Sequence, residues 1–375
     1  MRGYWRGWAA IAAAGIVAMT GVVGGAGPAG AAGSAASPAS TSFSTQGNLT
    51  DVAATSATNA WAIGDLANSK TEADTPIVLH WNGAKWSRVV IPKIKHAMLN
   101  AVAAVSASDA WIVGLDEDPV TPGNYESALV LHWNGRTWTR VLNPLFAGDL
   151  PSDVAATAKT VWVFAQRQIW HLTGGTWSLL PATLPLNGTT YASVGVAWPA
   201  TFWRGGYYQP TTGPYTAYVV RWNGFEWRRV AIPMHHPYDI IEAMAGGPHG
   251  QVWAVGYGSP VDGATEFAES MLWNGKQWRQ EPTIQSDSAF LGVGFIPGGG
   301  AWAVGYFGYG GVLAAHWTGK AWKPAPAPGV NPHAFLNAVA ATSAANAWAV
   351  GDVWQPPTAA TPTTIILHWD GSKWS

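Results

Sequence analysis

The chain has 375 residues, with 20 Lys and Arg against 21 Asp and Glu, which gives a formal net charge of −1. A chain this close to neutral lacks the basic surface that grips a phosphate backbone, so we expect no nucleic-acid partner. Apolar residues reach 48%, enough for a large core, and the absence of cysteine excludes disulfides and cysteine-ligated zinc.

The first 31 residues are typical of a secretion signal. Arg2 and Arg6 give a positive start, an apolar stretch covers residues 8–23, and Ala29-Gly30-Ala31 is a small-x-small cleavage pattern. An uncleaved membrane anchor is the alternative, although the apolar stretch is short and glycine-interrupted for a spanning helix. We therefore predict a signal peptide over residues 1–31, with no membrane span after cleavage. The protein is then secreted and extracellular, either free or associated with a cell wall.

Residues 48–375 contain seven copies of a ~50-residue unit. Comparable blocks are LTDVAATSATNAWAIG from Leu49, LNAVAAVSASDAWIVG from Leu99 and LNAVAATSAANAWAVG from Leu336. A Trp follows the opening residue of each unit by twelve positions, in the pairs Leu49/Trp61, Leu99/Trp111, Leu150/Trp162, Tyr191/Trp203, Ile241/Trp253, Phe290/Trp302 and Leu336/Trp348. A second pair of positions lies five residues apart, at Trp81/Trp86, Trp133/Trp138, Leu172/Trp177, Trp222/Trp227, Trp273/Trp278, Trp317/Trp322 and Trp369/Trp374.

Each unit is predicted to form four short strands. In the first unit these are Val52–Ala54, Ala60–Gly64, Ile77–Trp81 and a strand that begins at Trp86. An Asn-Gly pair between the third and fourth strands is a strong hairpin signal. Four-stranded units of this length, arranged radially, form a propeller. The predicted fold class is therefore all-β, a single seven-bladed β-propeller of four-stranded antiparallel blades, and we expect a monomer.

The segment LHWNGAKWSRVVIP, from Leu79 to Pro92, resembles the kelch half-repeat, in which an aromatic residue, an Asp or Asn turn, a Trp and a terminal Pro recur. One departure is that Gly64-Asp65 stands where kelch repeats have a Gly-Gly doublet. The resemblance implies a propeller similar to the central domain of galactose oxidase. Without cysteine, however, the chain cannot form that enzyme's Cys–Tyr crosslink, and the resemblance implies no particular function.

The seventh unit stops at Trp374-Ser375, whereas the other units continue for several strand residues beyond the equivalent Trp. Residues 32–47 are rich in Ala, Ser and Thr and are typical of a flexible lead-in. We predict that the end of this lead-in, Ser40 to Gly47, supplies the missing outer strand of blade seven and closes the ring.

Loop lengths predict where a ligand binds. Between the Trp of strand two and the aromatic position of strand three, the separation varies from 10 to 22 residues, whereas the turns within strand pairs are fixed. In a propeller these variable loops and the loops between blades emerge on one face, here called the variable-loop face, and such insertions often mark a binding surface. Its candidate ligand-binding residues are Tyr207, Tyr257, Tyr306, Trp354, Asp65 and Asp352. Aromatic rings beside carboxyl groups suit sugars, although tyrosines that merely cap the blade cores are the alternative.

Other chemistry-bearing residues are assigned no role. Histidine recurs one residue before the strand-three Trp position in five units, which favours a structural purpose. His96 and His333 share a second register in the variable loops. Asp116-Glu117-Asp118 offers oxygen ligands that Ca²⁺ prefers, but the run favours a solvated acidic loop over a calcium site. We therefore assign no metal site, no cofactor and no catalytic residue.

The resulting interpretation is a secreted, non-enzymatic binding module that engages a polysaccharide or a protein through the variable-loop face. The alternative is a carbohydrate-active hydrolase or lyase that brings loop carboxyls together in the central pocket, for instance Asp262 or Glu266 with Asp352. A structural scaffold without a small ligand is a third option, and it predicts a flat or plugged variable-loop face.

Overall fold

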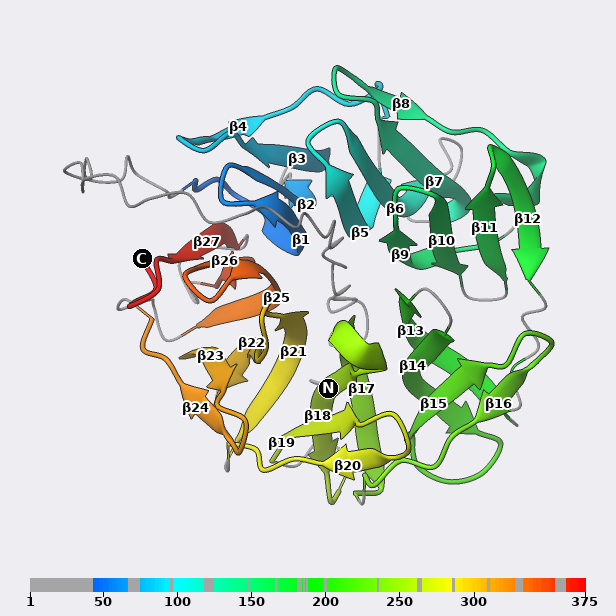
Figure 1. The fold of residues 1–375 in the computed structure, drawn as a ribbon, viewed down its shortest axis with the longest axis vertical. Coiled ribbons are helices and arrows are strands. Elements are labelled where there is room, and N and C mark those ends of the chain that lie inside the picture. The colour runs from blue at the N-terminus through cyan, green and yellow to red at the C-terminus, as the bar shows by residue number, and fades with distance from the viewer. Residues whose placement is uncertain are drawn as a thin grey trace, which may run out of the picture.

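The protein was analysed as a computed structural model that describes residues 43–66, 75–94, 97–117, 125–146, 149–165, 168–180, 184, 186, 188–198, 201–234, 236–261, 265–284, 287–308, 311–327, 333–354 and 362–375. The predicted signal over residues 1–31 lies outside these ranges. Within them, the chain forms seven antiparallel sheets arranged as a ring, which confirms the predicted seven-bladed propeller (Figure 1). No helix in the described ranges is long and apolar enough to cross a membrane.

Each blade runs outward from an inner strand at the centre of the ring. Blades one and two contain β1 (Asn48–Ser56), β2 (Asn59–Leu66), β3 (Thr75–Trp81) and β4 (Trp86–Arg88), then β5 (Ala97–Ser106), β6 (Asp109–Glu117), β7 (Tyr125–Trp133) and β8 (Trp138–Arg140). Blades three and four contain β9 (Pro151–Ala156), β10 (Thr160–Ala165), β11 (Ile169–Thr173) and β12 (Thr176–Leu180), then β13 (Gly188–Trp198), β14 (Thr201–Pro210), β15 (Thr216–Trp222) and β16 (Trp227–Arg229).

Blades five and six contain β17 (Tyr238–Gly246), β18 (Val252–Ser259), β19 (Phe267–Trp273) and β20 (Trp278–Gln280), then β21 (Ser288–Phe295), β22 (Ala301–Phe307), β23 (Gly311–Trp317) and β24 (Trp322–Pro324). Blade seven contains β25 (Ala334–Ser343), β26 (Asn346–Val353) and β27 (Thr363–Trp369). Two short 3₁₀ helices, η1 (Pro144–Phe146) and η2 (Pro248–Gly250), lie between strands.

The repeated tryptophans wedge neighbouring blades together. Trp61 of blade one packs against Trp133 and Trp138 of blade two, with both pairs of ring centroids 5.0 Å apart. The wedge recurs as Trp203 with Trp273/Trp278, Trp253 with Trp317/Trp322, Trp302 with Trp369/Trp374 and Trp348 with Trp81/Trp86. Edge-to-face contacts of this kind add to the stabilisation from burying the rings. The fixed Trp spacing in the sequence therefore reflects packing between blades.

The recurring histidines cover these tryptophans. His80 lies over Trp61 of the adjacent strand, with ring centroids 4.3 Å apart, and its Nε2 is hydrogen-bonded to Asn59 Oδ1 at 2.8 Å. The same pairing of rings occurs in Trp111/His132, Trp162/His171, Trp302/His316 and Trp348/His368. In blade four, Arg221 takes this place, 5.3 Å from the ring centroid of Trp203. These positions thus serve blade packing, as expected for residues that recur in most blades.

A bulge in every inner strand explains the repeated spacing between its opening residue and a fixed position of strand two, which is glycine in six blades and Ala165 in blade three. The pairing of β1 with β2 skips one residue between Leu49 and Asp51, and equivalent shifts occur in the other six inner strands. The bulge brings the backbone of the inner strand very close to strand two. A Cβ on Gly64 would lie 2.1 Å from the Asn48 carbonyl oxygen, so glycine is required there.

The C-terminus begins the fourth strand of blade seven. Trp374 forms a bridge with Trp369 of β27. The Ser375 N–H donates to the His368 carbonyl at 2.9 Å, and the His368 N–H donates back at 3.0 Å. These contacts lie at the Trp369 end of the outer edge of β27.

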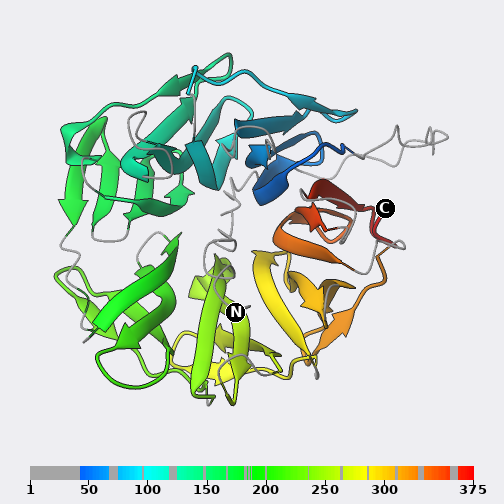
Figure 2. The same cartoon turned by 180° about the vertical axis from the view of Figure 1, so that it is seen from behind.

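The segment Thr45–Gly47 occupies the far part of the same edge of β27. The Gly47 N–H donates to the Pro362 carbonyl and the Thr364 N–H donates to the Thr45 carbonyl, both at 2.8 Å. The outer strand of blade seven is therefore supplied from both ends of the chain, which ties blade seven (red) to blade one (blue; Figure 2). The predicted ring-closing segment began at Ser40, and its residues 40–42 lie outside the described ranges.

Candidate functional site

Five of the six predicted ligand-binding residues occupy one register of the propeller. Each lies four positions after the strand-two Trp, at the variable-loop end of that strand: Asp65, Tyr207, Tyr257, Tyr306 and Asp352. The two aspartates are each only 7% exposed, and the three tyrosines are partly buried. The sixth residue, Trp354, is 46% exposed and follows β26 directly.

The structure joins two of these tyrosines to two glutamates in a group here called the acid–tyrosine cluster: Glu242, Tyr257, Glu266 and Tyr306. The Tyr306 hydroxyl donates a hydrogen bond to Oε2 of Glu266. Burial, together with the neighbouring Glu242 and Glu266, raises the pKa of Tyr257 above its usual value. The Tyr257 hydroxyl is thus a neutral donor at physiological pH.

The inner strand β17 contributes the buried acid of this cluster. Glu242 is the bulge residue of β17 and is 6% exposed. At the equivalent bulge positions of other blades, Thr50 donates to the Leu99 carbonyl at 2.8 Å and Asn100 donates to the Pro151 carbonyl at 2.7 Å. These hydrogen bonds connect the inner strands of adjacent blades. Burial, and then the charge of Glu266, raises the pKa of Glu242 to about 8, so its carboxyl group is mainly protonated at pH 7.

A second group lies on blade seven. The Asn337 side-chain N–H donates to Asp352 Oδ1 at 3.2 Å, and the Trp354 side chain is hydrogen-bonded to the same carboxyl group. Burial raises the pKa of Asp352 to about 6, although these two hydrogen bonds lower it in part. Phe335 connects this group to the cluster, because it lies opposite Asp352 in the β25–β26 ladder and packs against Tyr306 with ring centroids 5.1 Å apart.

Asp65 holds the same register on blade one, where its backbone N–H donates to Asn48 Oδ1 at 3.3 Å. Asp116 forms a 2.6 Å ion pair with Arg140. His96, Asp118 and Asp262 lie outside the described residues. Glu266 accepts a hydrogen bond from the Tyr306 hydroxyl and lies close enough to Glu242 to raise the pKa of that carboxyl group.

Three further residues were missed as a group by the sequence analysis. His236, Asp239 and Glu269 each place a ligand atom within 4.8 Å of the others, on the variable-loop side of blade five. Burial, and then the adjacent Glu269, raises the pKa of Asp239 to about 8. Glu269 lies 30 positions after Asp239, so its approach depends on the pairing of β17, β18 and β19 and gives no local sequence signal.

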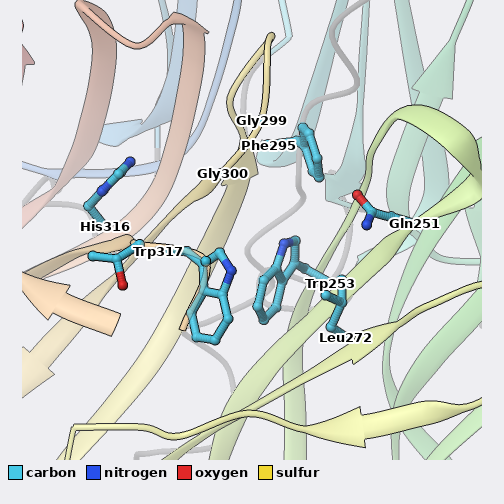
Figure 3. A pocket seen from close by; sticks show the side chains of 10 residues that line it. Gln251, Trp253, Leu272, Phe295, Gly299, Gly300, His316 and Trp317 are labelled. Carbon is cyan, nitrogen blue, oxygen red and sulfur yellow. The ribbon is translucent and has the colours of Figure 1, made fainter. Parts of the chain in front are cut away.

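The opposite face, formed by the turns within strand pairs, carries a cavity of about 360 Å³ between blades five and six. Figure 3 shows the indoles of Trp253 and Trp317 beside each other within it, with Gln251 nearby. In blade five, Leu272 lies opposite Trp253, at the position where five of the other blades place a histidine. Loop-length variation gave no indication of this cavity.

Neither a protein-family model nor a curated protein matches the chain. Solved structures match its fold, among them YCF48 bound to a D1 peptide, with 15% identity, a TM-score of 0.55 and coverage of 88% of this chain and 96% of that one. The β-propeller domain of the Trilobed protease from Pyrococcus furiosus has 11% identity, a TM-score of 0.55 and coverage of 89% and 96%. The GH74 xyloglucanase from Xanthomonas campestris has 15% identity, a TM-score of 0.58 and coverage of 88% of this chain and 56% of that one.

These likenesses show the fold: the chain is a seven-bladed β-propeller. None of the three structures is a kelch protein or galactose oxidase, so they support the propeller without supporting the closer kelch resemblance. Identities of 11–15% carry no activity from those proteins to this one.

Proposed function

We propose that this protein is a secreted, non-enzymatic binding module that holds a polysaccharide on its variable-loop face. One observation carries the proposal: the exposed Trp354 and the acid–tyrosine cluster form a connected patch across blades five to seven. Phe335 makes the connection, through its ring contact with Tyr306 and its register with Asp352.

The chemistry of this patch suits a sugar chain. Trp354 is 46% exposed, and its indole offers a flat apolar surface for the C–H face of a sugar ring. A side-chain hydrogen bond to the Asp352 carboxyl group restrains this residue. Neutral hydroxyl and carboxyl groups of Tyr257 and Glu242 can donate hydrogen bonds, and the Glu266 carboxylate can accept them. A patch with both donors and acceptors matches sugar hydroxyls, which both donate and accept.

Solved propellers of the same fold include proteins that act on polysaccharides and one that binds a peptide, and both kinds of ligand are compatible with the proposed binding role. The xyloglucanase and a PL25 ulvan lyase (TM-score 0.50, 10% identity) act on polysaccharides, while YCF48 was solved with a peptide. A protein ligand on the same face is therefore the alternative within the binding class. Secretion rests on the signal-like residues 1–31.

A carbohydrate-active hydrolase or lyase is the second candidate, and one observation favours it. Glu242 has a pKa of about 8, while its neighbour Glu266 is held by the Tyr306 hydroxyl. A carboxyl group that is protonated near neutral pH and lies beside a second carboxyl group is a candidate general acid for glycoside cleavage.

One experiment separates the two candidates. The purified protein is incubated with a panel of soluble and insoluble polysaccharides, and both retention of the protein and release of new sugar ends are measured. Saturable retention without release supports the binding module. Release that disappears in Glu242→Gln establishes the enzyme instead, and retention by no polysaccharide overturns the sugar-binding proposal in favour of a protein ligand.

A further inference from the structure

His236, Asp239 and Glu269 come from three neighbouring segments of blade five: the linker before β17, the start of β17 and β19. His236 Nδ1 lies 2.6 Å from Glu269 Oε1 and 3.6 Å from Asp239 Oδ1. The two carboxylate side chains are each 5% exposed, whereas the imidazole is 34% exposed. Two buried carboxyl groups therefore converge on a single imidazole nitrogen.

Gly258 marks the point on which the three groups converge. It lies opposite Asp239 in the β17–β18 ladder. A Cβ placed on Gly258 would lie 2.3 Å from Asp239 Oδ1, 2.7 Å from His236 Nδ1 and 3.0 Å from Glu269 Oε1. These separations approach metal–ligand bond lengths of about 2.0–2.6 Å, and because Gly258 has no side chain, no Cβ occupies that point.

Asp239 provides a second and independent observation. Its Oδ1 is buried and has no hydrogen-bond partner among the described residues, and the residue as a whole is 4% exposed. Buried polar atoms nearly always have a partner, because an unpaired one costs roughly 1–3 kcal/mol. The Oδ1 atom is also the one nearest the convergence point, so a bound cation would supply the missing partner.

We propose that His236, Asp239 and Glu269 bind a divalent transition-metal ion such as Zn²⁺. One imidazole nitrogen and two carboxylate oxygens suit zinc and its neighbours, whereas Ca²⁺ takes about 6–8 oxygen ligands. The charge of the ion also offsets the two closely spaced carboxylates. This site is distinct from the acid–tyrosine cluster and from the polysaccharide patch proposed on blades five to seven.

Three protein ligands leave the metal a coordination position for an exogenous group. A cavity of about 390 Å³ adjoins the site, between blades four and five, and His236 and Asp239 form part of its lining. Arg229 also lines this cavity and donates from Nη1 to the Tyr208 hydroxyl at 3.2 Å. A metal and a guanidinium beside one cavity suit an anionic oxygen ligand, such as a carboxylate.

The test is a titration of the chelator-treated, purified protein with Zn²⁺ by isothermal calorimetry, with Co²⁺ absorption as a spectroscopic readout of an imidazole–carboxylate site. We expect one equivalent to bind. Asp239→Asn and Glu269→Gln are expected to weaken binding at least about tenfold, since even supporting residues of metal sites contribute about 10–100-fold. His132→Asn is the matched control, because His132 forms a 3.0 Å pair with Asp109 and is similarly exposed at 31%.

Gly258→Ala is the sharpest variant, because it removes no ligand and places a methyl group where the metal would lie. Its contacts are with the ends of three side chains, so the fold should accommodate the change, which a thermal melt checks. Loss of Zn²⁺ binding in folded Gly258→Ala supports the site. The proposal is overturned if the wild-type protein shows no saturable Zn²⁺ binding, or if Gly258→Ala and Asp239→Asn bind Zn²⁺ as tightly as the wild type.

Discussion

Replacing Asp51 by Ala is expected to destabilise the propeller strongly, because this fully buried carboxyl connects the inner strands of two blades. Its Oδ1 accepts the Val52 N–H at 2.7 Å, and its Oδ2 accepts the Val102 N–H of β5 at 2.8 Å. Asp51→Ala leaves two buried N–H groups without an acceptor, at about 1–3 kcal/mol each, so we expect a loss of roughly 2–6 kcal/mol in the free energy of unfolding.

The assay is urea unfolding followed by tryptophan fluorescence, comparing midpoints at constant m-value. Asp109→Ala is the control, because its carboxyl also accepts side-chain hydrogen bonds but is 33% exposed, and we expect it to cost under about 1 kcal/mol. An Asp51→Ala midpoint within error of Asp109→Ala would refute the reasoning that this carboxyl latches the two blades.

The buried Asp51 carboxyl group should also make the stability of the protein depend on pH. Burial raises the pKa of Asp51 well above 3.8, with the backbone N–H donors lowering it in part. A raised folded-state pKa means that the native state disfavours the carboxylate, so its contribution to stability falls as the pH rises above the unfolded-state value. Asp51→Asn has no carboxyl group to ionise at this position. As the pH rises from 4 to 8, the free energy of unfolding of the wild type should therefore fall relative to that of Asp51→Asn. If the difference in unfolding free energy between the two proteins did not change with pH, the raised pKa of Asp51 would be contradicted.

Three further predictions concern other features of the fold. Gly351→Ala places a Cβ 1.9 Å from the Phe335 carbonyl oxygen and should lower the free energy of unfolding by about 1–3 kcal/mol or more. Gly258→Ala meets only the ends of side chains and should lower it less. Equal melting temperatures of the two variants would contradict the requirement for glycine at the bulge. Burial raises the pKa of Asp352 from 3.8 to about 6, so the stability of the protein should fall by up to about 3 kcal/mol as the pH rises from about 3 to 7. Asp352→Asn should remove this dependence in denaturant titrations. Deleting Thr45–Gly47 together with all preceding residues should expose the edge of β27 to hydrogen exchange, and unchanged protection there would show that the N-terminal segment does not close the ring.

The fold could be predicted from the sequence because its packing repeats. The twelve-residue step from Leu49 to Trp61 spans one bulged strand and one tight turn, and the same geometry imposes it on every blade. Glycine at Gly64 follows from the same bulge. These constraints act within a unit, so the Trp step appears in all seven units and the glycine in six of them, with Ala165 in the third.

The candidate site was less predictable because it depends on how individual blades differ. The register of Tyr257 and Tyr306 could be found from the repeat, but their contacts with Glu242 and Glu266 depend on the inner-strand bulge and on the loop before β19. His236 likewise approaches Glu269 only through the pairing of three strands across Gly258.

The most direct test of the proposed binding surface compares the affinities of two aromatic variants for whichever polysaccharide the panel identifies. Trp354→Ala removes the 46% exposed indole on the variable-loop face, and Phe225→Ala removes an 88% exposed ring from a turn on the opposite face. We predict that Trp354→Ala weakens binding at least about tenfold, since aromatic anchors contribute about 1–2 kcal/mol or more, and that Phe225→Ala binds as tightly as the wild type. Undiminished affinity in Trp354→Ala, or a loss confined to Phe225→Ala, would contradict the assignment of the variable-loop face.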